Sequence, residues 1–134
     1  MVDRRGVPLA VRCSAANVHD SRMLAALVDA VPPVRHGRGR PKRRPQKLHA
    51  DKGYDYPACR AALRRRHITP RIARRGVESA ERLGRWRWVV ERTLSWLHRF
   101  RRLTVRYERR ADLYQAFLTL ACALICHRML HQGF

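Results

Sequence analysis

Two carboxylates stand at positions where an acidic side chain can do chemistry. Asp51 directly follows the short β-prone run 47–50, so we expect it at the C-terminal end of a strand, where α/β proteins place their active sites. Glu91 lies in a long stretch with helical periodicity. Carboxylate oxygens are hard ligands that suit Mg²⁺ or Mn²⁺. Asp51 and Glu91 therefore suggest the hypothesis of a metal-dependent site that acts on phosphate esters.

The helix expected at about 84–103 determines how Glu91 is presented. One broad apolar stripe is predicted to be its core face, formed by Trp86, Val89, Val90, Leu94, Trp96, Leu97 and Phe100. Glu91 lies off this stripe, and its helical neighbours are Arg87, Ser95, His98 and Arg102. Taken alone, the helix favours a simpler interpretation, a solvated face with an ion pair between Glu91 and Arg87. Asp51 alone is also explained by a turn cap, and it is the two together that favour a site.

The charge of the chain points to a polyanionic partner. The 134 residues include 30 Lys and Arg against 10 Asp and Glu, a formal net charge of +20. A domain this basic repels itself unless an acidic partner neutralises it, and nucleic acid is the usual partner. The predominance of Arg over Lys suits bidentate contacts with phosphates and base edges.

The hydrophobic pattern predicts the elements that carry these residues. Strand-like and helix-like stretches alternate, which is typical of an α/β fold. The expected strands are 7–13, 47–51 and 68–72, and the expected helices run from Asp20 or Ser21 through Val28 and over 56–66, 84–103 and 112–130. The apolar run 116–126 is shorter than the roughly 20 residues of a membrane span. We therefore expect it to be a buried helix.

A basic loop is expected over 35–47, where Gly and Pro are interspersed with Arg38, Arg40, Lys42, Arg43 and Arg44. Residues 37–42 resemble the core of an AT-hook, an extended basic segment that enters the minor groove of A·T-rich DNA. The alternative is a plain loop that follows phosphates. The plain loop is the favoured interpretation, because short basic runs with Gly and Pro are common.

Four blocks, taken in order, resemble those of DDE insertion-sequence transposases. Ala50–Asp55 resembles the second catalytic block, and Trp88–Thr93, followed by Arg99–Leu103, resembles the third. Gly6–Ala10 and Asn17–Ser21 are similar to the strand and the helix start that precede them in the family. The resemblance covers nearly the whole chain, and 91 − 51 = 40 residues separate the two acids.

This resemblance implies a ribonuclease-H-like fold, a mixed sheet with flanking helices whose N-terminal strand or strands are missing here. In the family, two Asp and one Glu hold two divalent metals, usually Mg²⁺, and by the resemblance Asp51 is the second acid and Glu91 the third. The family's helix motif often has Tyr, Arg, Glu and Lys at fixed spacing. Arg87 and Glu91 match it, whereas Gly84 and His98 replace its Tyr and Lys.

The first acid of the family has no counterpart in the chain. Its strand would precede residues 6–11, whereas Asp3 lies at the turn before that segment and Asp20 at the next helix start. The hypothesis is therefore a truncated or second-frame product with little or no cleavage activity alone. Its expected partners are double-stranded DNA at transposon ends and target, the N-terminal part of the transposase, and further copies when complete. Its expected place is the bacterial cytoplasm at the nucleoid, with no membrane.

Further DNA contacts are expected beside the two acids, from Lys52, Arg87, Trp88, Arg92, His98 and Arg102. Trp88 lies off the apolar stripe, which favours a DNA contact over packing for this tryptophan. His49 and His98 could act near the metals, although a hydrogen-bonded bystander is the commoner role. The alternative for the whole chain is a basic nucleic-acid-binding protein without catalysis.

The cysteines raise a separate question of metal binding. Cys13, Cys59, Cys122 and Cys126 show no Cys-x-x-Cys spacing, which predicts reduced thiols in a cytoplasmic protein. Cys122 and Cys126, with the pair His127 and His131, have spacings that would permit a zinc site. Their apolar surroundings favour buried thiols instead.

Overall fold

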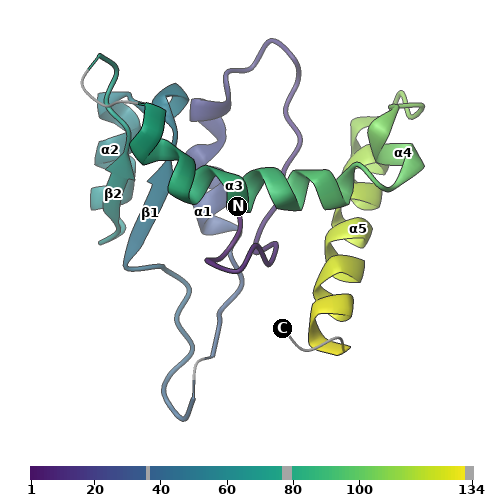
Figure 1. The fold of residues 1–134 in the computed structure, drawn as a ribbon, viewed down its shortest axis with the longest axis horizontal. Coiled ribbons are helices and arrows are strands. Elements are labelled where there is room, and N and C mark those ends of the chain that lie inside the picture. Colours follow the sequence, from purple (N-terminus) through teal and green to yellow (C-terminus); the bar gives the residue numbers. More distant parts are fainter. Residues whose placement is uncertain (36, 77–79, 132–134) are drawn as a thin grey trace. The chain divides into compact units, whose positions relative to one another are not determined.

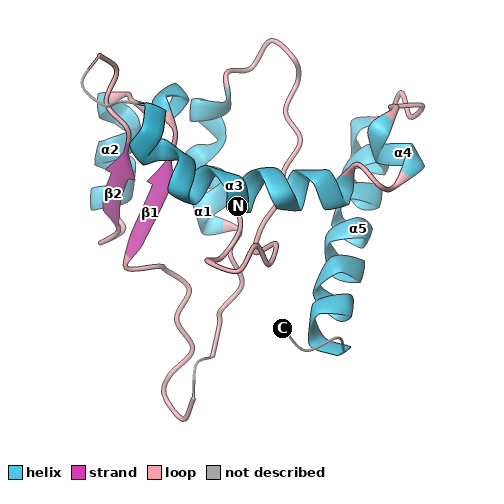
Figure 2. Cartoon of the chain, in the orientation of Figure 1, coloured by secondary structure: helices cyan, strands magenta, loops and turns pink. Residues whose placement is uncertain are grey.

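The computed structural model describes residues 1–35, 37–76 and 80–131, except for the side chains of 80–86 (Figure 1). The chain divides into two compact units. The strand unit comprises Ser14–Arg87, and the helix unit joins Met1–Cys13 to Trp88–Phe134. Both strands belong to the strand unit (Figure 2).

The strand unit is built on two short parallel strands. Its elements are the 3-10 turn η1 (Asp20–Met23), α1 (Leu24–Asp29), β1 (Lys47–Ala50), the 3-10 turn η2 (Lys52–Tyr54), α2 (Pro57–Arg64) and β2 (Thr69–Ile72). Parallel strands need a crossover connection, and α2 supplies it. The core of this unit includes Leu24, Val28, Leu48, Leu63, Ile68 and Ile72. This arrangement fits the predicted α/β class, and β1 and β2 confirm the strands expected at 47–51 and 68–72.

Local sequence explains where the helices of the strand unit begin. Pro57 occupies the first turn of α2, where its missing N–H costs nothing. The helix expected after Asn17 is present as η1 and α1, but its cap differs from the prediction. The N-cap is His19, whose ring accepts a hydrogen bond from the Ser21 amide, rather than Asp20 or Ser21. An imidazole nitrogen can accept in the same way as the shorter polar side chains that usually cap helices.

The helix unit contains the end of α3 (Ala80–Leu97), the short α4 (Arg101–Thr104) and α5 (Ala111–His131). Its core is formed by Leu97, Leu103, Ala121 and Ile125, with aromatic side chains such as Trp96, Phe100 and Phe117 packed against them. The helix expected over 84–103 thus ends at Leu97, and α4 follows as a separate turn. The consequence is that Arg102, which lies in α4, does not continue the face of α3 that carries Glu91.

The buried face of α3 differs from the predicted apolar stripe. Val89, Thr93 and Leu97 are buried, whereas Val90 and Leu94 are 46% and 48% exposed. The prediction missed Thr93 because it counted only apolar residues. The buried Thr93 hydroxyl lies 2.8 Å from the Gly6 carbonyl oxygen and 3.1 Å from the Val89 carbonyl oxygen, so its single O–H finds an acceptor inside the protein. The side chain of Trp86, also in the predicted stripe, lies outside the described part of the chain, as do the surroundings of Gly84, the residue expected to replace the family's Tyr.

Residues 7–13 do not form the expected strand. Val2 and Pro8 form only an isolated antiparallel bridge. Further along, the side chain of Gln115 on α5 donates to the Val11 carbonyl and accepts from the Cys13 amide. A side chain thus satisfies backbone groups that a sheet ladder would otherwise pair.

The C-terminal helix is longer and more exposed than the sequence suggested. At 21 residues, α5 is the one described helix long and apolar enough to cross a membrane, by length and composition alone. Ala121 and Ile125 are buried, but Leu120 is 57% exposed and Leu124 41%. The expectation of a buried helix is therefore correct for one face of α5 only.

Candidate catalytic acids and basic surfaces

Asp51 immediately follows β1, as the sequence predicted. It is the N-cap of η2, and its Oδ1 accepts a hydrogen bond of 2.8 Å from the Gly53 amide. A Cβ at position 53 would stand 2.9 Å from that same oxygen, so a larger residue there would push the Asp51 carboxylate out of this position. Asp51 is exposed. The turn cap and the position at the strand end, which the sequence offered as alternatives, therefore coexist in one residue.

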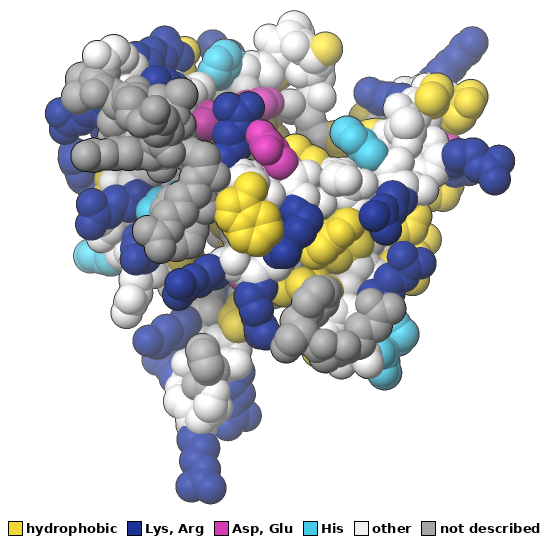
Figure 3. All heavy atoms as spheres, in the orientation of Figure 1, with side chains coloured by type: hydrophobic (Ala, Val, Ile, Leu, Met, Phe, Trp, Pro, Cys, Tyr) yellow, Lys and Arg dark blue, Asp and Glu magenta, His cyan; other side chains and the backbone are white. Residues whose placement is uncertain are grey.

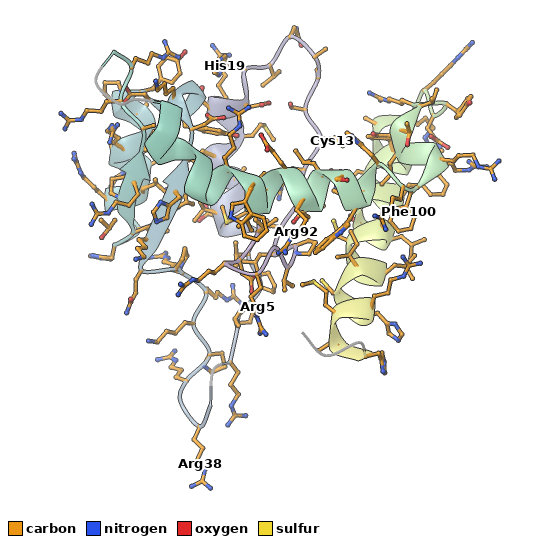
Figure 4. All side chains as sticks on the ribbon, in the orientation of Figure 1. Arg5, Cys13, His19, Arg38, Arg92 and Phe100 are labelled. Carbon is orange, nitrogen blue, oxygen red and sulfur yellow. The ribbon has the colours of Figure 1, made fainter. Side chains whose placement is uncertain are left out.

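A shallow hollow of about 320 Å³ lies beside Asp51 in the strand unit. Asp20, His19 and Tyr54 also line it, and His19 is labelled in Figure 4. Burial, together with the negative charges of Asp20 and Asp51, raises the pKa of the Tyr54 hydroxyl. Two acids therefore border one hollow, whereas the sequence assigned Asp20 only to a helix start. Asp20 lies in the Asn17–Ser21 block that the sequence singled out. Nothing in that block indicated which of its residues lies beside Asp51.

The turn after Asp51 is held by a network of arginines around Asp55. Arg60 donates to Asp55 Oδ1 at 2.7 Å, and the Arg75 amide donates to its other oxygen at 2.9 Å. The Arg60 hydrogen bond is the main reason that the pKa of Asp55 lies below its ordinary value. Arg75 also stacks over the ring of Tyr56. These contacts fix the segment that positions Asp51 without using the Asp51 carboxylate itself.

Glu91 lies on the exposed side of α3 in the helix unit. Arg87, one turn before it, is exposed as well. Hence α3 presents a carboxylate and a cation to solvent, as the sequence predicted for this helix. The two acids belong to different compact units.

Arg92 and Thr93, the two residues after Glu91, hold the N-terminal turn. The Arg92 guanidinium lies between two rings, 4.6 Å from the centre of Trp88 and 4.9 Å from that of Trp96. It donates to the Arg5 carbonyl, and Thr93 donates to the neighbouring Gly6 carbonyl at 2.8 Å. We call these contacts the arginine clasp. Figure 4 labels Arg5 and Arg92, which approach each other in this clasp.

Gly6 is required for this arrangement. Its φ is +84°, a region that only glycine enters without strain, and a Cβ there would lie 3.0 Å from the Thr93 hydroxyl oxygen. Asp3 completes the turn, because its carboxylate accepts from the amides of Arg5 and Val7, each at 2.8 Å. Arg92 Nε is buried and has no hydrogen-bond partner among the described residues. The sandwiching rings favour the guanidinium charge and offset part of that cost.

The other residues predicted to contact DNA have varied surroundings. Trp88 is 50% exposed, although Arg92 stacks on its ring. Arg102 pairs with Glu108 at 2.8 Å and stacks over Phe117, so much of its donor capacity is used inside the helix unit. His98 is exposed, and its carbonyl accepts from Thr104. Lys52 is half-buried in η2, directly after Asp51.

The basic loop is a hairpin. Val34 and Lys42 exchange two backbone hydrogen bonds of 2.9 Å and form an antiparallel bridge. Within the described part of this loop, the predicted DNA-binding residues are all exposed: Arg38, Arg40, Lys42, Arg43 and Arg44. Lys and Arg side chains cover its projecting end in Figure 3, and Arg38 is labelled there in Figure 4. The structure thus gathers these cations on one projection.

The cysteines and histidines of α5 show no metal cluster. Across the described ranges, no group of three or more His, Cys, Asp or Glu side chains is arranged to hold a metal. His127 and His131 stack at 4.3 Å between ring centroids. Burial raises the pKa of the thiols of Cys122 and Cys126, which are half-buried and free of disulfides. The sequence favoured buried thiols over zinc ligands at these positions, and both thiols are half-buried.

His49 lies in β1, two residues before Asp51. Its pKa is lowered, mainly by burial and further by the nearby charges of Lys47 and Arg71. The lowered pKa favours the neutral form of this imidazole.

Comparison with known proteins gives two matches. The family model described as "Transposase DDE domain" matches residues 1–126. A Burkholderia cepacia protein, named as a transposase for insertion sequence element IS402, is 52% identical over 133 residues. That alignment covers 99% of this chain but only 63% of the relative, so the chain spans less than two thirds of the relative's length. No solved structure matches the chain.

Proposed function

Since this chain belongs to the transposase DDE domain family, we propose that it contributes to DNA transposition as part of a metal-dependent site that cleaves and transfers DNA strands at insertion-sequence ends. The observation that carries this proposal is the place of Asp51. It is an exposed carboxylate at the carboxyl end of a parallel strand, with its turn fixed by Gly53 and the Asp55 network. Glu91, exposed on α3, is the second proposed ligand.

The donor set suits the divalent metals that domains of this family generally use. Asp51 and Glu91 both offer carboxylate oxygens, the ligands that Mg²⁺ and Mn²⁺ prefer. A carboxylate has about four lone-pair sites, so accepting the Gly53 amide still leaves Asp51 capacity to bind a cation. When bound, two such ions would activate the attacking hydroxyl and stabilise the leaving oxygen of a phosphodiester.

The chain's own residues would orient the acids and hold DNA. The Gly53 amide fixes the rotamer of Asp51, and the arginine clasp fixes the helix segment directly after Glu91. Half-buried Lys52 and a set of exposed cations would neutralise phosphates, the exposed ones being Arg38, Arg40, Lys42, Arg43, Arg44 and Arg87. We assign Arg92 to the clasp rather than to DNA, because its contacts are intramolecular. The whole site belongs to a ribonuclease-H-like sheet in this proposal, with the remaining acid supplied by another part of a longer transposase.

The second candidate, a basic nucleic-acid-binding protein without catalysis, rests on the net charge of +20. Metal linkage separates the two. Duplex DNA binding is measured by fluorescence anisotropy at constant ionic strength, with and without Mn²⁺. We expect Mn²⁺ to tighten DNA binding by the wild type. The factor by which Mn²⁺ raises the DNA affinity should be more than about tenfold smaller in Asp51→Asn and in Glu91→Gln.

Asp112→Asn is the matched control, because Asp112 is an exposed acid whose carboxylate pairs with Arg110. It should respond to Mn²⁺ as wild type does. A fall in affinity with added Mn²⁺ in wild type, as counterion competition alone predicts, would reject the metal site and leave the binding protein.

A further inference from the structure

We propose that residues 34–42, here called the basic finger, read A·T-rich DNA by inserting Arg38 and Arg40 into the minor groove. This inference rests on the proposed function only in requiring that the chain bind duplex DNA. It names the groove and the base composition, which the proposed function leaves open. The sequence alone favoured a plain phosphate-following loop, and the geometry of the hairpin changes that balance.

The first observation is that the finger is a defined projection. Its base is closed by the paired backbone hydrogen bonds between Val34 and Lys42. Every described residue of the finger is exposed, and Arg38 lies at its far end in Figure 4. A loop lying along the protein surface would bury one side. This finger instead presents both sides to a partner.

The second observation is that the end of the finger is thin. Gly37 and Gly39 flank Arg38, and a Cβ built at either glycine meets no atom within 4 Å. The side chains of Arg38 and Arg40 are therefore neighboured along the chain by glycines, which add no side chain of their own. The minor groove of B-DNA is only about 6 Å wide, so a backbone that enters it must be narrow at the points of insertion. Glycine on both sides of Arg38 provides that narrowness.

The third observation is that the guanidinium groups have no internal partner. Among the described residues, Arg38 and Arg40 take part in no ion pair, hydrogen bond or ring contact. Arginine is weakly hydrated for a cation, and the narrow groove of A·T tracts has an enhanced negative potential. Phosphate tracking would need only positive charge. The combination of bare glycines and unengaged arginines favours groove insertion instead.

The test compares duplexes with an A·T tract and with G·C pairs, equal in length, at about 150 mM salt and without divalent metal. Wild type should prefer the A·T duplex by about tenfold, a discrimination typical of one or two specific contacts. Arg38→Lys/Arg40→Lys keeps the charge and should bring this ratio close to one, with little change on the G·C duplex. Arg43→Lys/Arg44→Lys, just beyond the bridge, is the matched control and should keep the wild-type ratio.

Gly39→Ala supplies a second variant, one that should leave the fold intact. The added methyl meets open space in the protein, so its fold should be intact by circular dichroism. In the minor groove the same methyl would collide with the walls, and we expect the A·T preference to fall. A minor-groove-binding polyamide should compete with wild type on the A·T duplex but not on the G·C duplex.

The outcomes separate this proposal from the proposed function. Equal affinity for both duplexes, or a preference that survives Arg38→Lys/Arg40→Lys, overturns the finger and leaves DNA binding and the metal site standing. An A·T preference lost in these variants supports the finger even when Mn²⁺ gives no gain in affinity, the result that rejects the metal site. Failure to bind either duplex overturns both.

Discussion

Arginines in the clasp and in the basic finger share one side-chain chemistry and have opposite surroundings. Arg92 is half-buried between Trp88 and Trp96 and bonded to the Arg5 carbonyl. Arg38 is exposed at the end of a hairpin, between glycines with open space around them. The clasp uses its arginine to hold the fold, whereas the finger keeps its arginines for a partner. Net charge therefore overstates the surface available to DNA, since some of the cations are committed internally.

The largest expected effect comes from Arg92→Ala. It removes two ring contacts worth about 0.5–1 kcal/mol each and a charged hydrogen bond worth about 1.5–3 kcal/mol. We expect the free energy of unfolding to fall by about 2.5–5 kcal/mol, measured by urea titration with tryptophan fluorescence. Arg38→Ala, the matched change in the finger, should stay within about 0.5 kcal/mol of wild type. Equal losses in the two variants would erase the comparison.

Glycines give a second contrast between the same two regions. Gly6→Ala forces a Cβ to 3.0 Å from the Thr93 hydroxyl at a φ of +84°. A left-handed backbone alone costs an L-residue about 1–2 kcal/mol, so stability should fall by that amount. Gly39→Ala meets no atom and should leave unfolding unchanged while it alters DNA preference. A destabilised Gly39→Ala chain would show that the finger is packed rather than free.

The clasp also shows where prediction from sequence stopped. The strands 47–51 and 68–72 and the place of Asp51 followed from local patterns and are confirmed, whereas residues 7–13 form no strand and the helix expected over 84–103 ends at Leu97. The anchoring of Gly6 by Thr93 did not follow from local patterns, because it joins residues 87 positions apart through a polar side chain. Periodicity counts apolar residues, so it placed Val90 and Leu94 in the core and passed over Thr93. The Asp20 and Asp51 hollow was missed for a similar reason, since only the fold brings those blocks together.

Arginine roles were equally hidden from the sequence. Both Arg92 and Arg38 were predicted to contact DNA, although Arg38 stands in a basic run and Arg92 directly follows Glu91. What separates them is the pair of rings on the same helix, at Trp88 and Trp96, one turn before and one turn after Arg92. This i−4, i, i+4 spacing is a signal that the sequence contained. It indicates a stacked guanidinium when the arginine lies at the edge of a buried face.

Thr93→Val tests the remaining bond of the clasp at nearly constant volume. The variant keeps the shape but loses the donor to the Gly6 carbonyl, so stability should fall by about 1–2 kcal/mol. Thr119→Val is the control, because its exposed hydroxyl bonds only within α5, to Gln115. Similar losses in both would mean that the valine change itself, not the Gly6 bond, is destabilising.

The smallest expected effect is a pH dependence of stability, which distinguishes the arginine clasp from an arginine paired with an acid. Arg60 holds Asp55, and this bond lowers the pKa of Asp55 in the folded chain. Because the pKa of Asp55 is lower in the folded chain than in the unfolded chain, its ionised carboxylate stabilises the fold. This contribution is fully present above the unfolded pKa of about 3.9 and is lost as the pH falls through the folded pKa. Asp55→Asn should therefore be less stable than wild type at pH 7, and the difference should close below about pH 3.9. Arg92 contacts rings and a carbonyl, which do not titrate, so the loss in Arg92→Ala should persist across this range. A clasp effect that also vanished in acid would place a carboxylate among its supports.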